Sequence, residues 1–188
     1  MELATISLDL ANQAFALQEE RLQGHITDLS KKNSLMQVTS EVLHRLTLGL
    51  KENKELDLNK EESVKELVLT LHRFYPHIFD RVVSGFPEGL LTQPVIAEDT
   101  SVDGIVRSAL KQVDIHSVTI SKMRSEDIDA MIRGLENQLD IEASLVNQTS
   151  FAVNQEYSDR KQIVDVMREL LRQMHELLRR INQNARGA

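Results

Sequence analysis

The sequence contains no cysteine and no tryptophan, and it has few glycines and prolines. With 7 Gly and 3 Pro in 188 residues, it has too few turn residues for a sandwich or barrel of short strands. The missing cysteines exclude a disulfide framework, a thiolate nucleophile and a cysteine-ligated zinc site. Aromatic residues make up only 4% of the chain, so its core has to be aliphatic. Together with many Leu, Glu, Gln and Arg residues, these absences predict an all-α or mainly α fold with more than roughly 60% helix.

Charge and hydropathy argue against two further classes, general nucleic-acid-binding proteins and transmembrane proteins. The formal net charge is −7, which disfavours general binding to nucleic acid. No uncharged apolar run is long enough to span a bilayer, so no transmembrane segment is predicted. Residues 1–10 lack the basic start and the apolar run of a secretory signal peptide. Any export of the chain therefore has to follow a route without a cleaved signal.

The N-terminal part of the chain carries a strict seven-residue apolar repeat. Its members are Leu8, Phe15, Leu22, Leu29, Met36, Leu43 and Leu50. Such a repeat keeps one stripe of a helix against a partner, which predicts a coiled-coil seam on a helix over residues 6–49. The expected companion positions are mostly polar: Asn12, Glu19, Ile26, Asn33, Ser40 and Thr47. A buried asparagine such as Asn33 fixes register, and a polar companion row indicates either a loosely packed helix or one that awaits a partner.

The C-terminal part carries a second, wider pattern. One heptad phase, interrupted only by Arg160, contains Ile132, Leu139, Val146, Val153, Met167, Met174 and Ile181. It predicts a single helix over residues 126–181 with Ser125 as its N-cap. Two further apolar rows accompany this phase: Tyr157, Val164, Leu171 and Leu178, and also Ile163, Leu170 and Leu177. Because one partner helix cannot cover three rows, we expect a protein interface formed by Tyr157, Val164, Met167, Leu171, Met174, Leu178 and Ile181.

The segment between the two repeats predicts short helices. Asn59 followed by Glu62 resembles a capping pair, and the helix that it opens has to end before Pro76. Pro76 can open a short helix that Gly85 stops.

Further along this segment, a helix is expected over residues 102–111. A short strand over residues 115–120 is expected beside residues 94–96. The predicted organisation is thus an N-terminal coiled-coil helix (1–50), a middle helical and loop region (51–124) and a long amphipathic helix (125–188). The two long helices are expected to pack antiparallel in one cooperative domain.

No set of residues predicts catalysis, a cofactor or a metal. Glu41 and His44 have the spacing of a helical di-iron ligand pair, but no second such pair accompanies them. His175 and Glu176 begin a zinc-peptidase pattern in which Arg179 replaces the second histidine ligand. Glycine-rich phosphate loops and nucleophile elbows are also missing. We therefore expect no enzyme, no cofactor and no metal centre.

The two helical segments resemble the needle-tip and filament proteins of bacterial type III secretion systems. The resemblance is carried by residues 17–46 (LQEERLQGHITDLSKKNSLMQVTSEVLHRL) and 151–181 (FAVNQEYSDRKQIVDVMRELLRQMHELLRRI). Members of that family have a long N-terminal coiled-coil helix, a variable middle and a long C-terminal helix used for assembly. The resemblance implies a tip or filament subunit that is made in the bacterial cytoplasm and exported without a cleaved signal.

Two functions therefore remain open. The first is a non-enzymatic, exported assembly subunit that associates with copies of itself and with a secretion chaperone or apparatus component. The second is a cytosolic coiled-coil adaptor, chaperone or scaffold that holds the helix of another protein. Both need exposed apolar rows, but an adaptor should stop at a small closed oligomer whereas a filament subunit should polymerise.

Overall fold

The computed structural model describes residues 2–51 and 56–186. In chain order its elements are α1 (Glu2–Lys51), α2 (Glu62–Phe74), α3 (Pro76–Phe79), β1 (Val83–Ser84), α4 (Glu88–Leu91), α5 (Val102–Leu110), β2 (Thr119–Ile120) and α6 (Ser125–Arg186). The structure is 77% helical, which confirms the predicted class. Within the described ranges, no helix is both long and apolar enough to cross a membrane.

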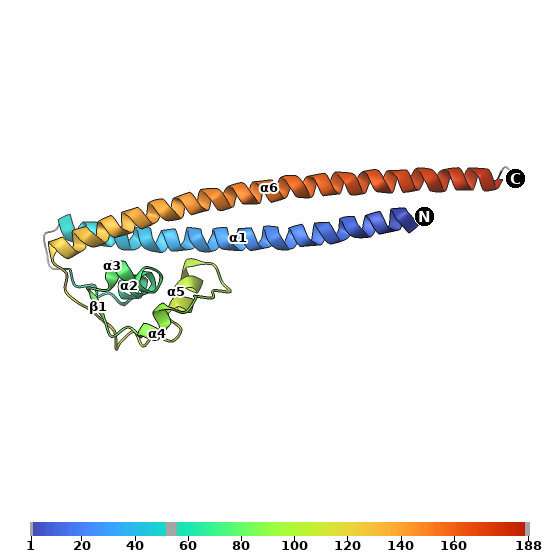
Figure 1. The fold of residues 1–188 in the computed structure, drawn as a ribbon. Helices are drawn as coiled ribbons and strands as arrows, with labels where there is room; N and C mark the ends of the chain where they lie inside the picture. Colours follow the sequence, from blue (N-terminus) through green and yellow to red (C-terminus); the bar gives the residue numbers. More distant parts are fainter. Residues whose placement is uncertain (1, 52–55, 187–188) are drawn as a thin grey trace. The chain divides into compact units, whose positions relative to one another are not determined.

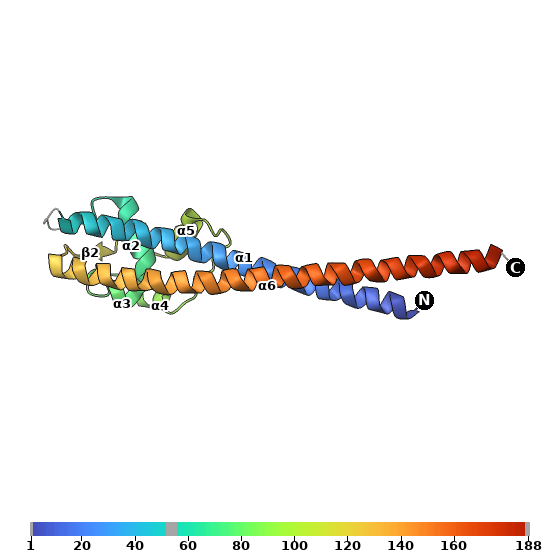
Figure 2. The ribbon, with the colours of Figure 1, turned by 90° about the horizontal axis from the view of Figure 1, so that it is seen from above.

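The helices α1 and α6 are uninterrupted, run antiparallel and pack against each other (Figures 1 and 2). All three prolines, Pro76, Pro87 and Pro94, lie between them in the sequence. Neither long helix therefore loses a backbone hydrogen bond to a proline ring. Both helices contain the ranges predicted for them, 6–49 and 126–181, and continue a few residues beyond. The predicted pair of long helices is thus confirmed.

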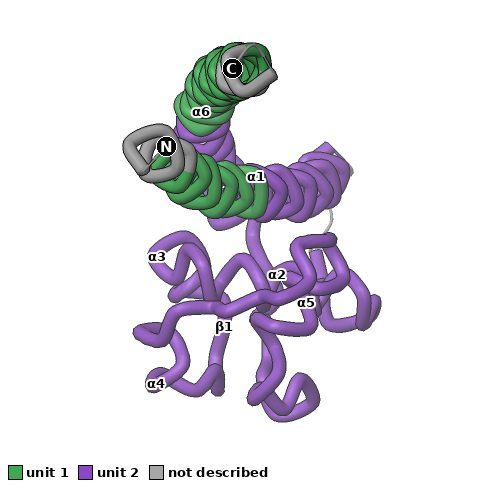
Figure 3. The backbone as a smooth tube through the Cα atoms, turned by 90° about the vertical axis from the view of Figure 1, so that its right-hand side faces the viewer, with its two compact units in different colours: residues 1–28, 148–188 green, residues 29–147 purple. Residues whose placement is uncertain are grey.

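The chain divides into two compact units (Figure 3). Unit 1 consists of Met1–Asp28 and Gln148–Ala188, and unit 2 consists of Leu29–Asn147. Unit 1 thus contains only the first half of α1 and the second half of α6, whereas unit 2 contains every short element. The boundary between the units falls within both long helices.

Unit 2 contains the hydrophobic core. Its buried apolar side chains come from α1 (Leu35, Val38, Val42, Leu46), from α2 (Val64, Val68, Leu69, Leu71), from α6 (Ile128, Met131, Ile132, Leu135) and from the segments between them. Polar groups of α1 also bind the middle segment. The Ser34 hydroxyl donates to the Thr100 carbonyl at 2.6 Å, and the Lys31 ammonium donates to the Val95 carbonyl at 2.8 Å. This half of α1 is therefore held along its length by the segment that follows it.

The middle segment contains a two-stranded antiparallel sheet in which Val83 of β1 pairs with Ile120 of β2. A strand was expected within residues 115–120, and β2 lies there. The expectation that residues 94–96 pair with this strand was wrong. The partner of β2 is β1, and the Val95 carbonyl accepts a hydrogen bond from Lys31 of α1. Two-residue strands carry almost no pattern by which a partner can be predicted.

The role expected of Asn59 was also wrong. Glu61 precedes α2, and no side chain caps this helix. The Asn59 side chain instead binds the backbone of β2, accepting the Ile120 N–H at 3.1 Å and donating to the Ile120 carbonyl. Pro76 opens α3 as predicted, but α3 ends at Phe79, well before Gly85. Asn59 thus acts as a link between the start of the middle segment and its last strand.

Candidate interaction surface

The facing sides of α1 and α6 in unit 1 form a thin heptad seam. The least exposed positions recur at alternating spacings of three and four residues: Ala11, Phe15, Gln18, Leu22 and His25 on α1, and Thr149, Val153, Glu156, Arg160, Ile163, Met167, Leu170 and Met174 on α6. Leu22, 3% exposed, is the one fully buried apolar side chain among the described residues of unit 1. Polar and charged residues occupy several of the other positions. The seam therefore buries little apolar surface.

Arg160 explains the single interruption of the predicted phase on α6. Its Nη2 lies 2.9 Å from Oε2 of Glu19 on α1. Its guanidinium carbon also lies 4.7 Å from the centre of the Phe15 ring, in cation–π contact. A position that an aliphatic residue would fill in a regular coiled coil thus holds a charge, which is bound to two residues of the facing helix. These contacts set the register of the two helices in unit 1.

Of the predicted seam residues of α1, Phe15 and Leu22 lie in the seam of unit 1, while Leu29, Asn33, Met36 and Leu43 lie in unit 2. Leu22 is buried and Phe15, Leu29, Met36 and Leu43 are half-buried, whereas Asn33 is exposed. A seven-residue repeat does not reveal whether its companion positions come three or four residues later. The exposed Ile26 favoured four, but the structure uses three, so the expected companion row that includes Asn33 was wrong. The companion positions in unit 1 are Ala11, Gln18 and His25.

The predicted interface residues of α6 fall into two sets. Met167 and Met174 are half-buried and belong to the seam with α1. Tyr157, Val164, Leu171 and Leu178 form a separate row, here called the outer row. Within it Val164 is half-buried, while Tyr157, Leu171 and Leu178 are 50%, 50% and 47% exposed. Ile181 lies within α6, but its side chain is outside the described residues.

Basic residues flank the outer row. Lys161, Arg168 and His175 are exposed and follow members of the row by four residues, which places them on the same side of α6. We call these three residues the basic flank. Arg172, further round the helix, is bound within α6: its guanidinium lies 2.8 Å from Glu169 and 3.1 Å from Glu176. Its hydrogen bonds to the Glu169 carboxylate, together with one from Gln173, lower the pKa of that group to about 2.

Sequence reasoning missed an exposed apolar row on α1. Leu10 and Leu17 are 60% and 59% exposed, and Gly24 continues their seven-residue spacing. Beside this row lies a shallow depression of about 660 Å³, lined by Ala16, Glu19, Glu20, Gln23, Gly24 and Thr27. We call the row and the depression together the α1 outer face. The spacing of Leu10 and Leu17 is the signal for this face. Two leucines are a weaker signal than the longer repeat through Leu8, Phe15 and Leu22 beside them.

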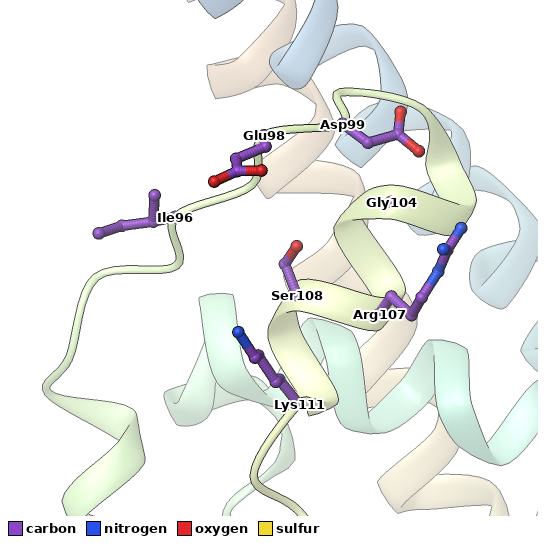
Figure 4. Close-up of a pocket in the computed structure, with 7 residues that line it drawn as sticks. All are labelled: Ile96, Glu98, Asp99, Gly104, Arg107, Ser108 and Lys111. Carbon is purple, nitrogen blue, oxygen red and sulfur yellow. The ribbon is translucent and has the colours of Figure 1, made fainter.

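A second depression, in unit 2, has no clear chemical preference (Figure 4). It measures about 560 Å³ and is lined by Ile96, Glu98, Asp99, Gly104, Arg107, Ser108 and Lys111. Acidic and basic groups are present in equal number, so neither an anion nor a cation is selected. The Asp99 carboxylate already accepts the Ser101 N–H at 2.9 Å, a bond that lowers the pKa of Asp99. Together with the bond from the Gly104 N–H to the Ser101 hydroxyl, this contact holds the start of α5.

Known proteins do not supply a function for the chain. No protein-family model matches it, no curated protein matches it, and no solved structure matches it. Among the described residues, no group of three or more His, Asp or Glu side chains is placed to hold a metal ion. The exposed apolar rows of unit 1 are the surface features described above that a partner could cover.

Proposed function

We propose that this protein is a non-enzymatic helical assembly subunit that associates with copies of itself through the outer row of α6. Following the resemblance of its two long helices, we further propose that it is a tip or filament subunit of a bacterial type III secretion system. Export would then occur without a cleaved signal, with a secretion chaperone or an apparatus component as a second partner.

The observation that carries the proposal is the distribution of apolar side chains in unit 1. Leu22 is fully buried there, whereas Tyr157, Leu171 and Leu178 keep about half of their surface in water. Burial of apolar surface is what stabilises helices in proteins, and an isolated pair of helices with a polar seam is marginal. A continuous apolar row on such a pair is typical of a surface that another chain covers.

The length of the row favours a helix as the covering element. Tyr157, Val164, Leu171 and Leu178 are separated by seven residues each, so the row extends for about 30 Å at 1.5 Å per residue. A partner helix of about 20 residues matches that length. Each apolar side chain that it buries fully contributes about 1.5–3 kcal/mol.

Sedimentation velocity of the purified chain tests the proposal. The unmodified protein should form large, concentration-dependent assemblies, and Leu171→Asp combined with Leu178→Asp should leave a folded monomer with unchanged circular dichroism. Ile141→Asp is a matched control, because Ile141 of α6 is 46% exposed and lies in unit 2. This control should assemble like the unmodified chain. A monomeric unmodified protein at high concentration would refute self-association.

The same experiment separates the two functions that the sequence leaves open. Open-ended polymers support a filament subunit, whereas a small closed oligomer supports an adaptor that holds a partner helix. Fractionation of bacteria that carry the protein tests the export step. The chain should be present in the medium under secretion conditions and should stay inside cells whose secretion apparatus is inactivated.

A further inference from the structure

The outer row of α6 needs a covering partner, and the chain itself carries a face that fits. This inference rests on the proposed function, because it identifies the surface that the outer row meets in the assembly. We infer that the outer row of one copy docks on the α1 outer face of the next copy. The contact is heterologous, since the two surfaces lie on different helices.

Charge favours this pairing. From residue 159 to the end the chain carries seven Lys/Arg against four Asp/Glu, whereas residues 9–28 carry four Asp/Glu against one Arg. Near the outer row the basic groups are Lys161 and Arg168, which are exposed; Arg168 also lies 3.6 Å from Asp165 of α6. On the α1 outer face Glu20 is exposed and Glu19 keeps half of its side chain in water while it binds Arg160. The net charge of the first range is thus +3 and that of the second is −3, although the exposed Arg21 follows Leu17 by four residues. The two ranges therefore attract each other, and they carry apolar rows of the same spacing.

The shape of the α1 outer face also suits a helix. The lining of the shallow depression consists of the small residues Ala16, Gly24 and Thr27 together with Glu19, Glu20 and Gln23. A side chain built on Gly24 would meet nothing within 4 Å. The exposed Leu17 is next to Ala16 in the sequence, and the exposed Leu10 lies about two turns before Leu17 on α1. Leucines of a docking helix can therefore lie in the depression against these small residues.

Pairing of the outer row with itself is disfavoured. Two copies of α6 that met through their outer rows would bring Lys161 and Arg168 of one copy near the same two residues of the other, although Arg168 is also 3.6 Å from Asp165 of its own helix. Like charges at such positions oppose association. The α1 outer face has less of this conflict, because residues 9–28 carry four acids and a single base, Arg21.

A heterologous contact has a structural consequence. Each copy offers one α6 outer row and one α1 outer face, so every copy can bind two neighbours. Such contacts generate a ring if the rotation between copies closes and an open helical filament if it does not. The proposed filament or tip assembly therefore needs no surface beyond the two on unit 1.

Complementation between two broken chains tests the inference. The first chain carries Leu171→Asp with Leu178→Asp and keeps its α1 outer face, while the second carries Leu10→Asp with Leu17→Asp and keeps its outer row. Each should be monomeric alone, and an equimolar mixture should give a 1:1 heterodimer by sedimentation or light scattering. A mixture that stays monomeric would overturn the inference, and so would a Leu10/Leu17 chain that assembles like the unmodified protein.

A variant that preserves the helix guards against misfolding as an explanation. Gly24→Gln replaces a poor helix former by a good one and has room in the isolated chain, but it fills the depression. We expect it to weaken assembly at least about tenfold while the helix content stays unchanged. Leu48→Asp is the matched control on α1, since Leu48 is 43% exposed and lies in unit 2. Assembly unaffected by Gly24→Gln would overturn the inference.

The outcomes separate this inference from the proposed function. If the unmodified chain does not associate at all, the proposed function fails. If it associates but the α1 variants have no effect, the proposed function stands and the inferred pairing is wrong. Raising the salt concentration from about 0.05 M to about 0.5 M should also weaken assembly, because the flanking charges are exposed. Assembly that strengthens at high salt would count against the charge pairing.

Discussion

Removing one leucine side chain from each unit should separate the stability of unit 1 from that of unit 2. Leu22 and Leu46 both lie on α1 and are 3% and 0% exposed. Leu46 belongs to the continuous core of unit 2. Leu22 belongs to the seam of unit 1, where its apolar neighbours along both helices are only half-buried. The same chemical change, leucine to alanine, therefore meets two different surroundings.

The expected magnitudes differ accordingly. Leu46→Ala leaves a cavity among well-packed neighbours and should lower the free energy of unfolding by about 2–5 kcal/mol. For a chain of this size each kcal/mol lowers the melting temperature by about 2–4 °C, so its main transition should fall by about 4–20 °C. Leu22→Ala removes the one fully buried apolar side chain described in unit 1. Its effect should be confined to unit 1, and the main transition should shift by less than about 2 °C.

Two measurements check this prediction under conditions in which the chain is monomeric. Thermal melting followed by circular dichroism gives the main transition of each variant. Amide hydrogen exchange gives the local stability of residues 9–28 and of residues 35–46. In Leu22→Ala the amides of the first range should exchange faster while those of the second keep their rates. In Leu46→Ala both ranges should exchange faster.

Equal losses of melting temperature in the two variants would refute the reasoning. Such a result would mean that unit 1 melts together with unit 2 as the one cooperative domain that the sequence pattern favoured. The distribution of buried side chains leads to the opposite expectation. All buried apolar residues in the described chain other than Leu22 lie between residues 35 and 135.

Three further predictions concern unit 2. Burial lowers the pKa of His72, whose Nδ1 lies 3.9 Å from Asp80. As the pH falls, the unfolded state therefore binds a proton on this histidine before the folded state does, so stability that is present above about pH 6.5 should be lost below it. His72→Leu should flatten this part of a curve of unfolding free energy against pH. Asn59→Ala leaves the Ile120 N–H without its acceptor and should cost about 1–3 kcal/mol in urea unfolding. Gly85→Ala forces a side chain onto a residue with φ of 82° and should cost about 1–2 kcal/mol in the same assay.

The long helices could be predicted from the sequence because their signal is local and repeated. Seven positions in phase from Leu8 to Leu50 specify both the helix and the side that faces a partner. The companion side was misplaced because polar residues fill it. Gln18 and His25 give no apolar signal, and the exposed Ile26 gave a false one.

The middle segment could be predicted only where its residues act locally. Pro76 fixes the start of α3, and Ser101 caps α5 by accepting the Gly104 N–H. Pairing of β1 with β2 and the contacts of Asn59 with Ile120 join residues far apart in the chain. These contacts depend on how the segment packs on α1 and α6, and no periodic pattern encodes that packing.

The outer row of α6 was predictable as a surplus of apolar residues, but its meaning depends on the weakness of the seam beside it. Arg160 occupies a seam position and binds Glu19 and Phe15, which specifies how α1 and α6 of one chain align. It does so at the cost of apolar burial, so the alignment is specific while the pair remains weakly stabilised. In the proposed assembly the missing burial comes from a neighbouring copy, through Leu171 and Leu178. Formation of the assembly should therefore raise the stability of unit 1, because the neighbouring copy supplies the apolar burial that the seam lacks.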